Sequence, residues 1–240
     1  MRRYRVIDRI EETADTATLA LEPVDEPLPV FRPGQFAMLH ASGAGEVPVR
    51  LSGRHGVAGL LHTVRAAGAT SGVLRAATPG RVLGVRGPFG RGWALPAPSD
   101  ADLVIVAGGL GLAPLRPVVG HAAAGRARYG RVAVLIGART PEDLLFADEY
   151  DDWRDERIDV LTTVERAGAG WTGRVGAVTG LLPLLRGDPA RTAAFVCGPE
   201  AMMRSAARGL VARGVAGRWV SPRRVVPGET ALPRPAATRR

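Results

Sequence analysis

The stretch Leu103–Pro117, LVIVAGGLGLAPLRP, decides the fold, because it predicts a buried strand that runs through a glycine turn into a helix. Residues 103–107 are all apolar, as is typical of a strand covered on both faces of a parallel sheet. Gly108, Gly109 and Gly111 would let the backbone adopt positive φ angles and approach a bulky group closely. A helix that begins near residue 111 would point its free N–H groups at that group, so the stretch predicts a bound pyrophosphate.

Pro114 stands where the third glycine of the common dinucleotide motif would be. A proline is tolerated in a first helical turn, because the N–H that it lacks has no partner there. By itself, the turn is therefore equally consistent with a plain connection between a strand and a helix. The rest of the chain has to decide between the two interpretations.

Residues after Asp102 alternate between strand and helix patterns, which predicts an α/β doubly wound parallel sheet. The predicted strands are residues 103–107, 131–137, 158–163 and 193–197. The predicted helices are residues 111–124, 141–154, 177–186 and 199–213. The glycine turn follows the first of these strands, as expected for a dinucleotide site.

Residues 1–90 instead show short alternating segments between turn residues, which predicts an antiparallel six-stranded β-barrel. Its strands are expected at residues 4–10, 16–22, 35–41, 47–52, 60–65 and 81–86. One short helix is expected at residues 71–76, with Thr70 or Ser71 as its N-cap. The strand patterns and the turn-rich residues that follow them divide the chain into a barrel domain, an α/β domain and a basic Pro/Arg-rich tail. The tail is expected to be disordered. The boundaries are 1–97, 98–218 and 219–240.

The composition excludes several classes of protein. The 46% hydrophobic content suffices for a globular core, and no apolar run approaches the ~20 residues that a membrane span needs. The N-terminal segment carries acids where a signal peptide would be apolar, so a cytoplasmic location is expected. The single cysteine excludes an internal disulfide, and the histidines lack the pair spacing of a zinc site, so no metal is predicted.

The net charge of +9 raises the possibility of nucleic-acid binding. Residues 204–240 contain nine arginines and a single acid, Glu229, so nearly all of the excess charge lies at the C-terminal end. A diffuse basic tail is more often a solvated segment than a reader of DNA. No nucleic-acid partner is therefore expected.

Arg50 and Ser52 lie two residues apart on a predicted strand, so both side chains project from one face. A cation and a hydroxyl in this arrangement can hold a phosphate and the edge of a ring. The alternative is an exposed arginine and serine on a barrel rim, which the spacing alone favours. The surrounding motifs reverse that preference.

Several ordered motifs carry a family resemblance: FRPGQF at 31–36, VPVRLS at 47–52, GATSG at 68–72, GVRGPFG at 84–90, VAGGLGLAPLRP at 106–117, GARTPEDLLF at 137–146 and CGPEAMM at 197–203. Together they resemble the ferredoxin-NADP reductase superfamily, in which a barrel binds flavin and a Rossmann-like domain binds a nicotinamide dinucleotide. The likeness is greatest to the flavin subunits of cytoplasmic NAD(P)-linked hydrogenases, anaerobic sulfite reductases and dihydroorotate dehydrogenase electron-transfer units. The resemblance implies FAD and NAD(P)H as cofactors.

The resemblance also implies roles for residues of the barrel. Arg50 matches the cation on the flavin pyrophosphate, and Ser52 the hydroxyl near the reactive flavin nitrogen. Leu51 replaces an aromatic residue that many relatives use against the ring. His62, Thr63 and Val64 match the strand whose backbone holds the ring edge. Gly68 and Ser71 match the helix start that holds the pyrophosphate.

In the second domain, Gly108, Gly109 and Gly111 match the nicotinamide dinucleotide turn. Cys197, Gly198 and Pro199 match the loop beside the nicotinamide. Ser52 and Cys197 are thus expected at the reaction centre. A small buried residue that ends a strand is the common alternative for Cys197, and even a functional Cys197 is expected to shape the site rather than to attack.

The implied function is that of a flavin-dependent NAD(P)H oxidoreductase that passes electrons to a redox protein or to the catalytic subunit of a larger complex. A flavin supplies this chemistry itself, so no catalytic acid or base is expected. Close relatives hold a [2Fe–2S] cluster with four cysteines after the final strand, and residues 222–240 contain no cysteine. A redox-inactive binding or assembly subunit is therefore the alternative.

Arg139 bears on the choice of dinucleotide, since it follows the second strand of the α/β domain. An acid at this place favours the ribose diol of NAD, whereas a cation can accept the 2′-phosphate of NADP. The motif that contains Arg139 is similar both to motifs of proteins that use NAD and to motifs of proteins that use NADP. We favour NAD slightly.

Overall fold

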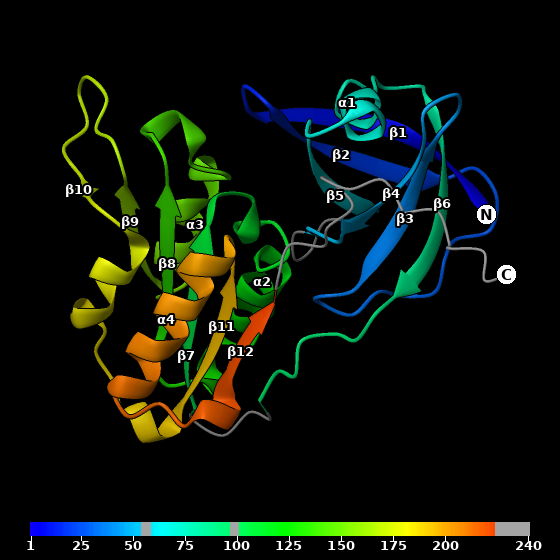
Figure 1. Ribbon diagram of the computed structural model, residues 1–240. Helices are drawn as coiled ribbons and strands as arrows, with labels where there is room; N and C mark the ends of the chain where they lie inside the picture. The colour runs from blue at the N-terminus through cyan, green and yellow to red at the C-terminus, as the bar shows by residue number, and fades with distance from the viewer. Residues whose placement is uncertain (54–58, 97–100, 224–240) are drawn as a thin grey trace, which may run out of the picture.

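The computed structural model describes residues 1–53, 59–96 and 101–223, which form two units side by side (Figure 1). The N-terminal unit is an antiparallel β-barrel with one short helix. The C-terminal unit is a parallel sheet with helices on both faces. Both predicted fold classes are confirmed. None of the helices formed by the described residues has the length and apolar content needed to cross a membrane.

The barrel sheet has the strand order β4-β3-β6-β1-β2-β5. Its elements are β1 (Arg2–Thr13), β2 (Thr16–Pro23), β3 (Phe36–Ala41), β4 (Gly45–Arg50), β5 (Leu60–Arg65), α1 (Ala69–Arg75) and β6 (Val82–Phe89). A single bridge between Leu51 and His62 joins the ends of the two edge strands and closes the sheet. Alternate side chains, such as Leu19 and Leu21 on β2, fill the interior. The barrel therefore closes at the motif that the sequence singled out for flavin.

The second sheet has the order β10-β9-β8-β7-β11-β12. Its strands are β7 (Asp102–Gly108), β8 (Val132–Ala138), β9 (Asp159–Val164), β10 (Arg174–Val175), β11 (Thr192–Cys197) and β12 (Val220–Arg223). Every residue of β7 is buried, as the apolar run predicted. Successive strands from β7 to β10 are added on one side of β7, and β11 is then added on its other side. The order of strand addition therefore reverses between β7 and β11. Such a switch point is where open α/β sheets bind ligands.

Helices cover this sheet in two layers. The α-helices are α2 (Arg116–Ala124), α3 (Tyr150–Asp155) and α4 (Glu200–Ala212), and the 3₁₀ turns are η1 (Gly109–Leu112), η2 (Arg126–Arg128), η3 (Pro141–Asp143), η4 (Ala147–Glu149), η5 (Val178–Leu184), η6 (Pro189–Arg191) and η7 (Gly217–Trp219). The core residues of α2 and α3 belong to one apolar cluster, and those of α4 and η5 to another. The sheet is thus covered on both faces, which explains its uninterrupted apolar strands.

Three predicted helices are wrong in extent, whereas α4 agrees with the prediction for residues 199–213. The α-helix expected from residue 111 begins at Arg116 and follows the short η1 turn. Pro114 and Pro117 lack the N–H groups that an α-helix would need there, so the chain takes 3₁₀ bonds such as Leu115 N to Leu112 O. In the same way, 177–186 becomes the 3₁₀ turn η5, which contains Pro183.

The helix predicted at residues 141–154 is divided into η3, η4 and the short α3. Phe146 interrupts it, since its backbone is left-handed with φ of 56°. The N-cap prediction is also wrong: α1 begins two residues earlier than expected, at Ala69, and Gly68 is its N-cap.

Two strands were not predicted. The strand β10 has only two residues, and β12 contains Pro222, which restricts it to a sheet edge. Residues Val220–Arg223 were expected to belong to a disordered tail, but they pair in parallel with β11. The rest of that tail, 224–240, and the predicted boundary between 97 and 98 lie outside the described residues.

Gly111 generates the first testable prediction. A Cβ at Gly111 would lie 2.2 Å from the carbonyl oxygen of Cys197, whereas a Cβ at Gly109 would meet nothing within 4 Å. We expect Gly111→Ala to lower the free energy of unfolding by roughly 3 kcal/mol or more, because backbone would have to move. Gly109→Ala is the matched control and should cost about 1–2 kcal/mol, since its φ is +51°. Chemical denaturation of both variants measures the difference, and equal losses would contradict the packing role.

Candidate functional site

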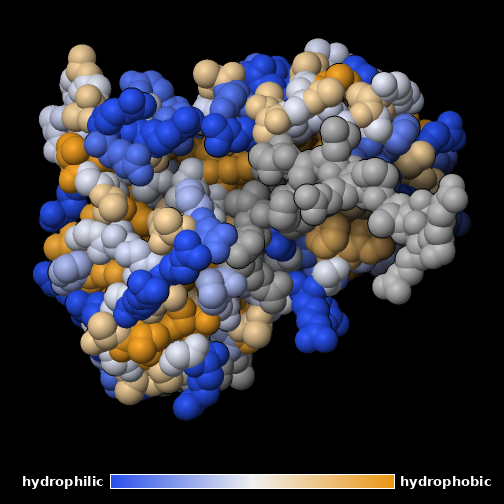
Figure 2. Space-filling model, viewed as in Figure 1, coloured by the Kyte–Doolittle hydropathy of each residue, from blue (hydrophilic) through white to orange (hydrophobic). Residues whose placement is uncertain are grey.

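A cavity of about 880 Å³ lies between the barrel and the α/β unit. This volume is in the range of cofactor sites. Its α/β wall is formed by the residues that follow β7, β8, β9 and β11, which are Gly108–Gly111, Ala138–Arg139, Glu165 and Gly198–Pro199. The carboxyl ends of parallel strands thus meet at the switch point. In Figure 2, apolar surface lies in the gap between the two units, with hydrophilic residues on either side.

The three glycines of the turn have different physical roles. Gly109 has a φ of +51° and open space where a Cβ would be, so its backbone is accessible from the cavity. Gly111 lets the turn pass against Cys197 and Gly198 at the end of β11. Gly108 packs below Pro199 and Met202. The expectation of positive φ at all three is therefore wrong for Gly108 and Gly111, where a glycine is required by close packing.

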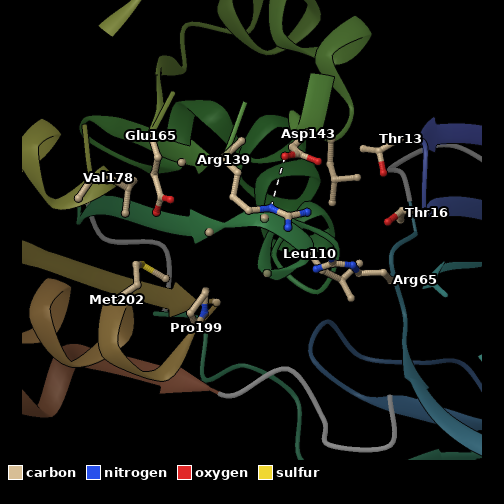
Figure 3. A pocket seen from close by; sticks show the side chains of 18 of the residues that line it. Thr13, Thr16, Arg65, Leu110, Arg139, Asp143, Glu165, Val178, Pro199 and Met202 are labelled. Carbon is tan, nitrogen blue, oxygen red and sulfur yellow. Dashed lines mark ion pairs between the residues drawn. The ribbon is translucent and has the colours of Figure 1, made fainter. Parts of the chain in front are cut away.

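The barrel wall of the cavity was not predicted from the sequence. It includes Thr13, Thr16 and Arg65, which Figure 3 shows facing Leu110 and Arg139 of the α/β unit. Arg65 Nε donates to Asp15 Oδ2 at 2.7 Å, which orients the guanidinium. Arg65 ends a predicted strand just before the GATSG motif, but its pairing with Asp15 depends on strand pairing across 50 residues. The spacing of residues in the sequence therefore does not predict this ion pair.

Arg139, predicted to bind the dinucleotide, directly follows β8 and lines the cavity. Its Nε is 3.4 Å from Asp143 Oδ2, an ion pair marked in Figure 3. Its side chain is 55% exposed, so the charge remains available to an anion. Glu165, at the end of the next strand, also lines the cavity and was not predicted. This rim therefore presents a cation and an acid to the cavity.

The barrel residues with predicted flavin roles gather at the closure of the barrel. Arg50 Nη1 donates to Gly34 O at 2.6 Å, and His62 Nδ1 lies 3.0 Å from Arg50 O. Thr63 Oγ1 lies 2.8 Å from Ser52 Oγ, within hydrogen-bond distance. The side chain of Val64 is buried in the barrel core, so only its backbone can meet a ligand. The cavity lining does not include this group.

His62 is fully buried, and its Nε2 has no hydrogen-bond partner among the described residues. Burial lowers the pKa of His62 from 6.5 to about 4, so the ring is neutral near pH 7. Since the Arg50 carbonyl accepts from Nδ1, Nε2 is left as a buried acceptor. An orphaned acceptor of this kind fits a polar ligand edge at the barrel closure.

Gly68 is the N-cap of α1, and Ser71 lies in the first turn of this helix. The Ser71 hydroxyl oxygen accepts from the N–H groups of Ala67 and Gly68, both at 3.0 Å. Nothing lies within 4 Å of the place where a Gly68 Cβ would be. Ser71 therefore shapes this turn, and Gly68 keeps its backbone open to a ligand.

Cys197 ends β11 and is fully buried. Burial raises the pKa of its thiol to about 12, although the nearby guanidinium of Arg50 acts in the opposite direction. The thiol therefore stays protonated, which disfavours a nucleophilic role. Arg50 at the end of β4 is thus within electrostatic range of the end of β11.

A buried guanidinium joins the two units. Arg116 Nη1 donates to Ser52 O at 3.1 Å, and its Nε donates to Glu149 Oε2 at 3.1 Å. Its carbon Cζ lies 4.2 Å from the centre of the Phe146 ring. The sequence contains Arg116 in its decisive stretch, but it gives no sign of a partner in the barrel.

The buried His62 leads to a pH prediction. Because its folded pKa lies below 6.5, the unfolded chain binds the proton more tightly, and stability is lost as the pH falls from 6.5 to about 4. This contribution amounts to at most about 3 kcal/mol. We expect His62→Gln to flatten the dependence of the unfolding free energy on pH in this window, measured by chemical denaturation. The exposed His121 gives the control His121→Gln, which should keep the wild-type slope. An unchanged slope in His62→Gln would contradict the assignment.

Comparisons with known proteins agree with this geometry. Residues 105–208 match the family described as Oxidoreductase NAD-binding domain. The chain is 35% identical over 210 residues to a probable dihydroorotate dehydrogenase B (NAD(+)) electron transfer subunit of Methanocella arvoryzae, covering 87% of this chain and 72% of that protein. It is 33% identical over 189 residues to sulfhydrogenase 1 subunit gamma of Pyrococcus furiosus. That match covers 77% of this chain and 64% of the relative, so it spans less than two thirds of the relative's length.

Solved structures share the two-unit fold. A ferredoxin NADP+ reductase from Neisseria gonorrhoeae with bound FAD and NADP has a TM-score of 0.76 at 19% identity, covering 92% of this chain and 97% of that one. The FAD/NAD binding domain of nitric oxide dioxygenase from Vibrio cholerae has a TM-score of 0.80 at 15% identity, with coverages of 93% and 98%. The resemblance inferred from the motifs is confirmed. The chain belongs to the ferredoxin-NADP reductase-like family of FAD- and NAD-binding oxidoreductases.

Proposed function

We propose that this chain is a flavin-dependent oxidoreductase that takes a hydride from NAD(P)H onto FAD and forwards the electrons to a protein partner. The convergence of the two halves carries the proposal. Arg116 of α2 donates to the Ser52 carbonyl at the barrel closure, and the cavity at the switch point of the α/β sheet has walls from both units. A flavin held by the barrel closure and a nicotinamide held beside Cys197 would therefore meet.

A bound FAD would supply both the two-electron and the one-electron chemistry. Arg50 would hold its pyrophosphate with a guanidinium fork, and the hydroxyl of Ser52 would face its reactive nitrogen. Gly109 would offer its backbone to the dinucleotide, and Pro199, which lines the cavity close to the buried and protonated Cys197, would shape the nicotinamide pocket. Leu51, which replaces the aromatic residue of many relatives, would cover the ring by apolar contact alone.

The partner is proposed to be a redox protein or the catalytic subunit of a larger complex. Two relatives support this, since they are named as the gamma subunit of a sulfhydrogenase and as an electron transfer subunit. Both names describe parts of assemblies.

The proposal predicts that FAD binds and that NADH or NADPH bleaches the flavin absorbance under anaerobic conditions. We expect Arg50→Ala to weaken FAD binding by roughly ten- to a hundredfold, or ~1.5–3 kcal/mol, since a charge-assisted contact is lost. The gain in Tm on adding FAD should shrink accordingly. Arg81→Ala, at an exposed site of the barrel, is the control. A protein that takes up no flavin would refute the proposal, and one that binds FAD without being reduced would favour the assembly-subunit alternative.

Arg139 predicts how the dinucleotides are distinguished. Its exposed guanidinium could accept a 2′-phosphate, so we expect Arg139→Ala to lower kcat/KM for NADPH by roughly tenfold, about 1.4 kcal/mol, and to leave NADH nearly unaffected. Steady-state kinetics with both cofactors make the measurement. Arg166→Ala, an exposed arginine outside the cavity lining, is the matched control. Equal losses with NADH and NADPH would show that Arg139 has no role toward the phosphate.

A further inference from the structure

A row of four hydrogen-bonding side chains crosses the barrel from Glu12 to Ser52. Glu12 Oε1 lies 2.6 Å from Thr18 Oγ1, and Thr18 Oγ1 lies 2.8 Å from Thr63 Oγ1. Thr63 Oγ1 lies 2.8 Å from Ser52 Oγ. Every step is within hydrogen-bond distance. The row therefore connects the hydroxyl of Ser52 with a carboxyl group without a gap.

The strand pairing builds this row. Thr18 on β2 and Thr63 on β5 are directly opposite each other, and Ser52 N donates to Leu61 O beside them. The pairing of β1 with β2 shifts by one residue between Glu11 and Thr13, so Glu12 is the extra residue of a bulge. Bulges redirect a side chain and are frequent near active sites. Here the bulge aligns a carboxyl group with the threonine pair.

The two ends of the row differ in their surroundings. Thr18, Thr63 and Ser52 are all buried, whereas Glu12 is partly exposed. A proton on Glu12 can therefore exchange with solvent, while a proton on Ser52 reaches solvent through the row.

Glu12 is also influenced by the α/β unit. Thr18 Oγ1 donates to its carboxylate, and the backbone of Phe146 lowers its pKa. Arg116 of α2 and Asp148 of η4 act on it with opposite signs. Burial outweighs these contacts and raises the pKa of Glu12 above its usual value. Glu12 is thus easier to protonate than an exposed glutamate.

The number of hydroxyl protons limits the directions that the hydrogen bonds of the row can take. Each hydroxyl carries one proton, so all bonds of the row point either toward Ser52 or toward Glu12. When Glu12 is protonated, the bonds point toward Ser52 and the Ser52 proton is free for an outside acceptor. When Glu12 is ionised, the bonds point toward Glu12 and the Ser52 oxygen is free to accept.

We propose that Glu12, acting through Thr18 and Thr63, exchanges the proton at Ser52 Oγ with solvent when the electrons leave toward the partner. The inference rests on the proposed function. A hydride brings two electrons and one proton. The electrons pass to the partner, and the proton passes to Ser52 Oγ. At the same time the Ser52 proton moves to Thr63, the Thr63 proton to Thr18 and the Thr18 proton to Glu12. Glu12 then releases its proton to solvent. Glu12 touches no reacting atom and is a positioning residue. Hydride uptake still requires no acid or base.

The first test uses the flavin-free protein. Infrared spectra over a pH titration should show a protonated carboxyl band that Glu12→Gln removes. Because the Thr18 hydroxyl stabilises the ionised form, Thr18→Val should move the midpoint of this band to higher pH. A midpoint that is the same with and without the Thr18 hydroxyl would overturn the row.

The second test uses the FAD-loaded protein, reduced by NADH and then reoxidised by a one-electron acceptor. Glu12→Gln and Thr18→Val, which break the row at different bonds, should both slow reoxidation roughly tenfold or more and remove its pH dependence and solvent deuterium effect. Reduction by NADH should keep its wild-type rate. Glu11→Gln, on the exposed neighbour, is the control and should behave as wild type.

The outcomes separate the two proposals. A wild-type protein that NADH does not reduce refutes the proposed function, and the proton row with it. A wild-type protein that is reduced and reoxidised, with Glu12→Gln showing the same pH profile and solvent effect, refutes the proton row alone.

Discussion

The buried guanidinium of Arg116 is the contact on which the arrangement of the two units depends. It pairs with Glu149 inside the α/β unit, donates to the Ser52 carbonyl in the barrel and lies over the Phe146 ring. A buried charge is costly unless its donors are satisfied, so a shift of one unit against the other would leave the cation with fewer partners. Trp93 Nε1 adds a second anchor by donating to Pro114 O at 3.0 Å.

This docking brings the chemistry of the two units together. The cavity has walls from both units, and Ser52 belongs to both networks: its carbonyl accepts from Arg116, and its hydroxyl ends the row that begins at Glu12. The backbone of Phe146 and the guanidinium of Arg116 in turn lower the pKa of Glu12. The position of the α/β unit therefore influences both ends of the proposed proton path.

Burial also sets the charge state of the proposed reaction centre. It keeps the His62 ring and the Cys197 thiol neutral at pH 7, while the guanidinium of Arg50 keeps its charge. A site with neutral walls and a fixed cation suits a ligand that combines a flat ring with a pyrophosphate. It does not suit acid or nucleophilic catalysis by either buried group.

The sequence by itself determined the two fold classes, most of the strands and the family, because alternating and uninterrupted apolar runs, glycine turns and ordered motifs are local properties. It also identified the residues that follow β7 and β11. The tertiary structure decided how they act. Gly111 is needed because the carbonyl of Cys197, 86 residues away, passes against it, and two prolines delay α2 to Arg116. The partners of Arg116 and the row from Glu12 depend on strand register and on the docking of the two units, which residue types and their spacing do not encode.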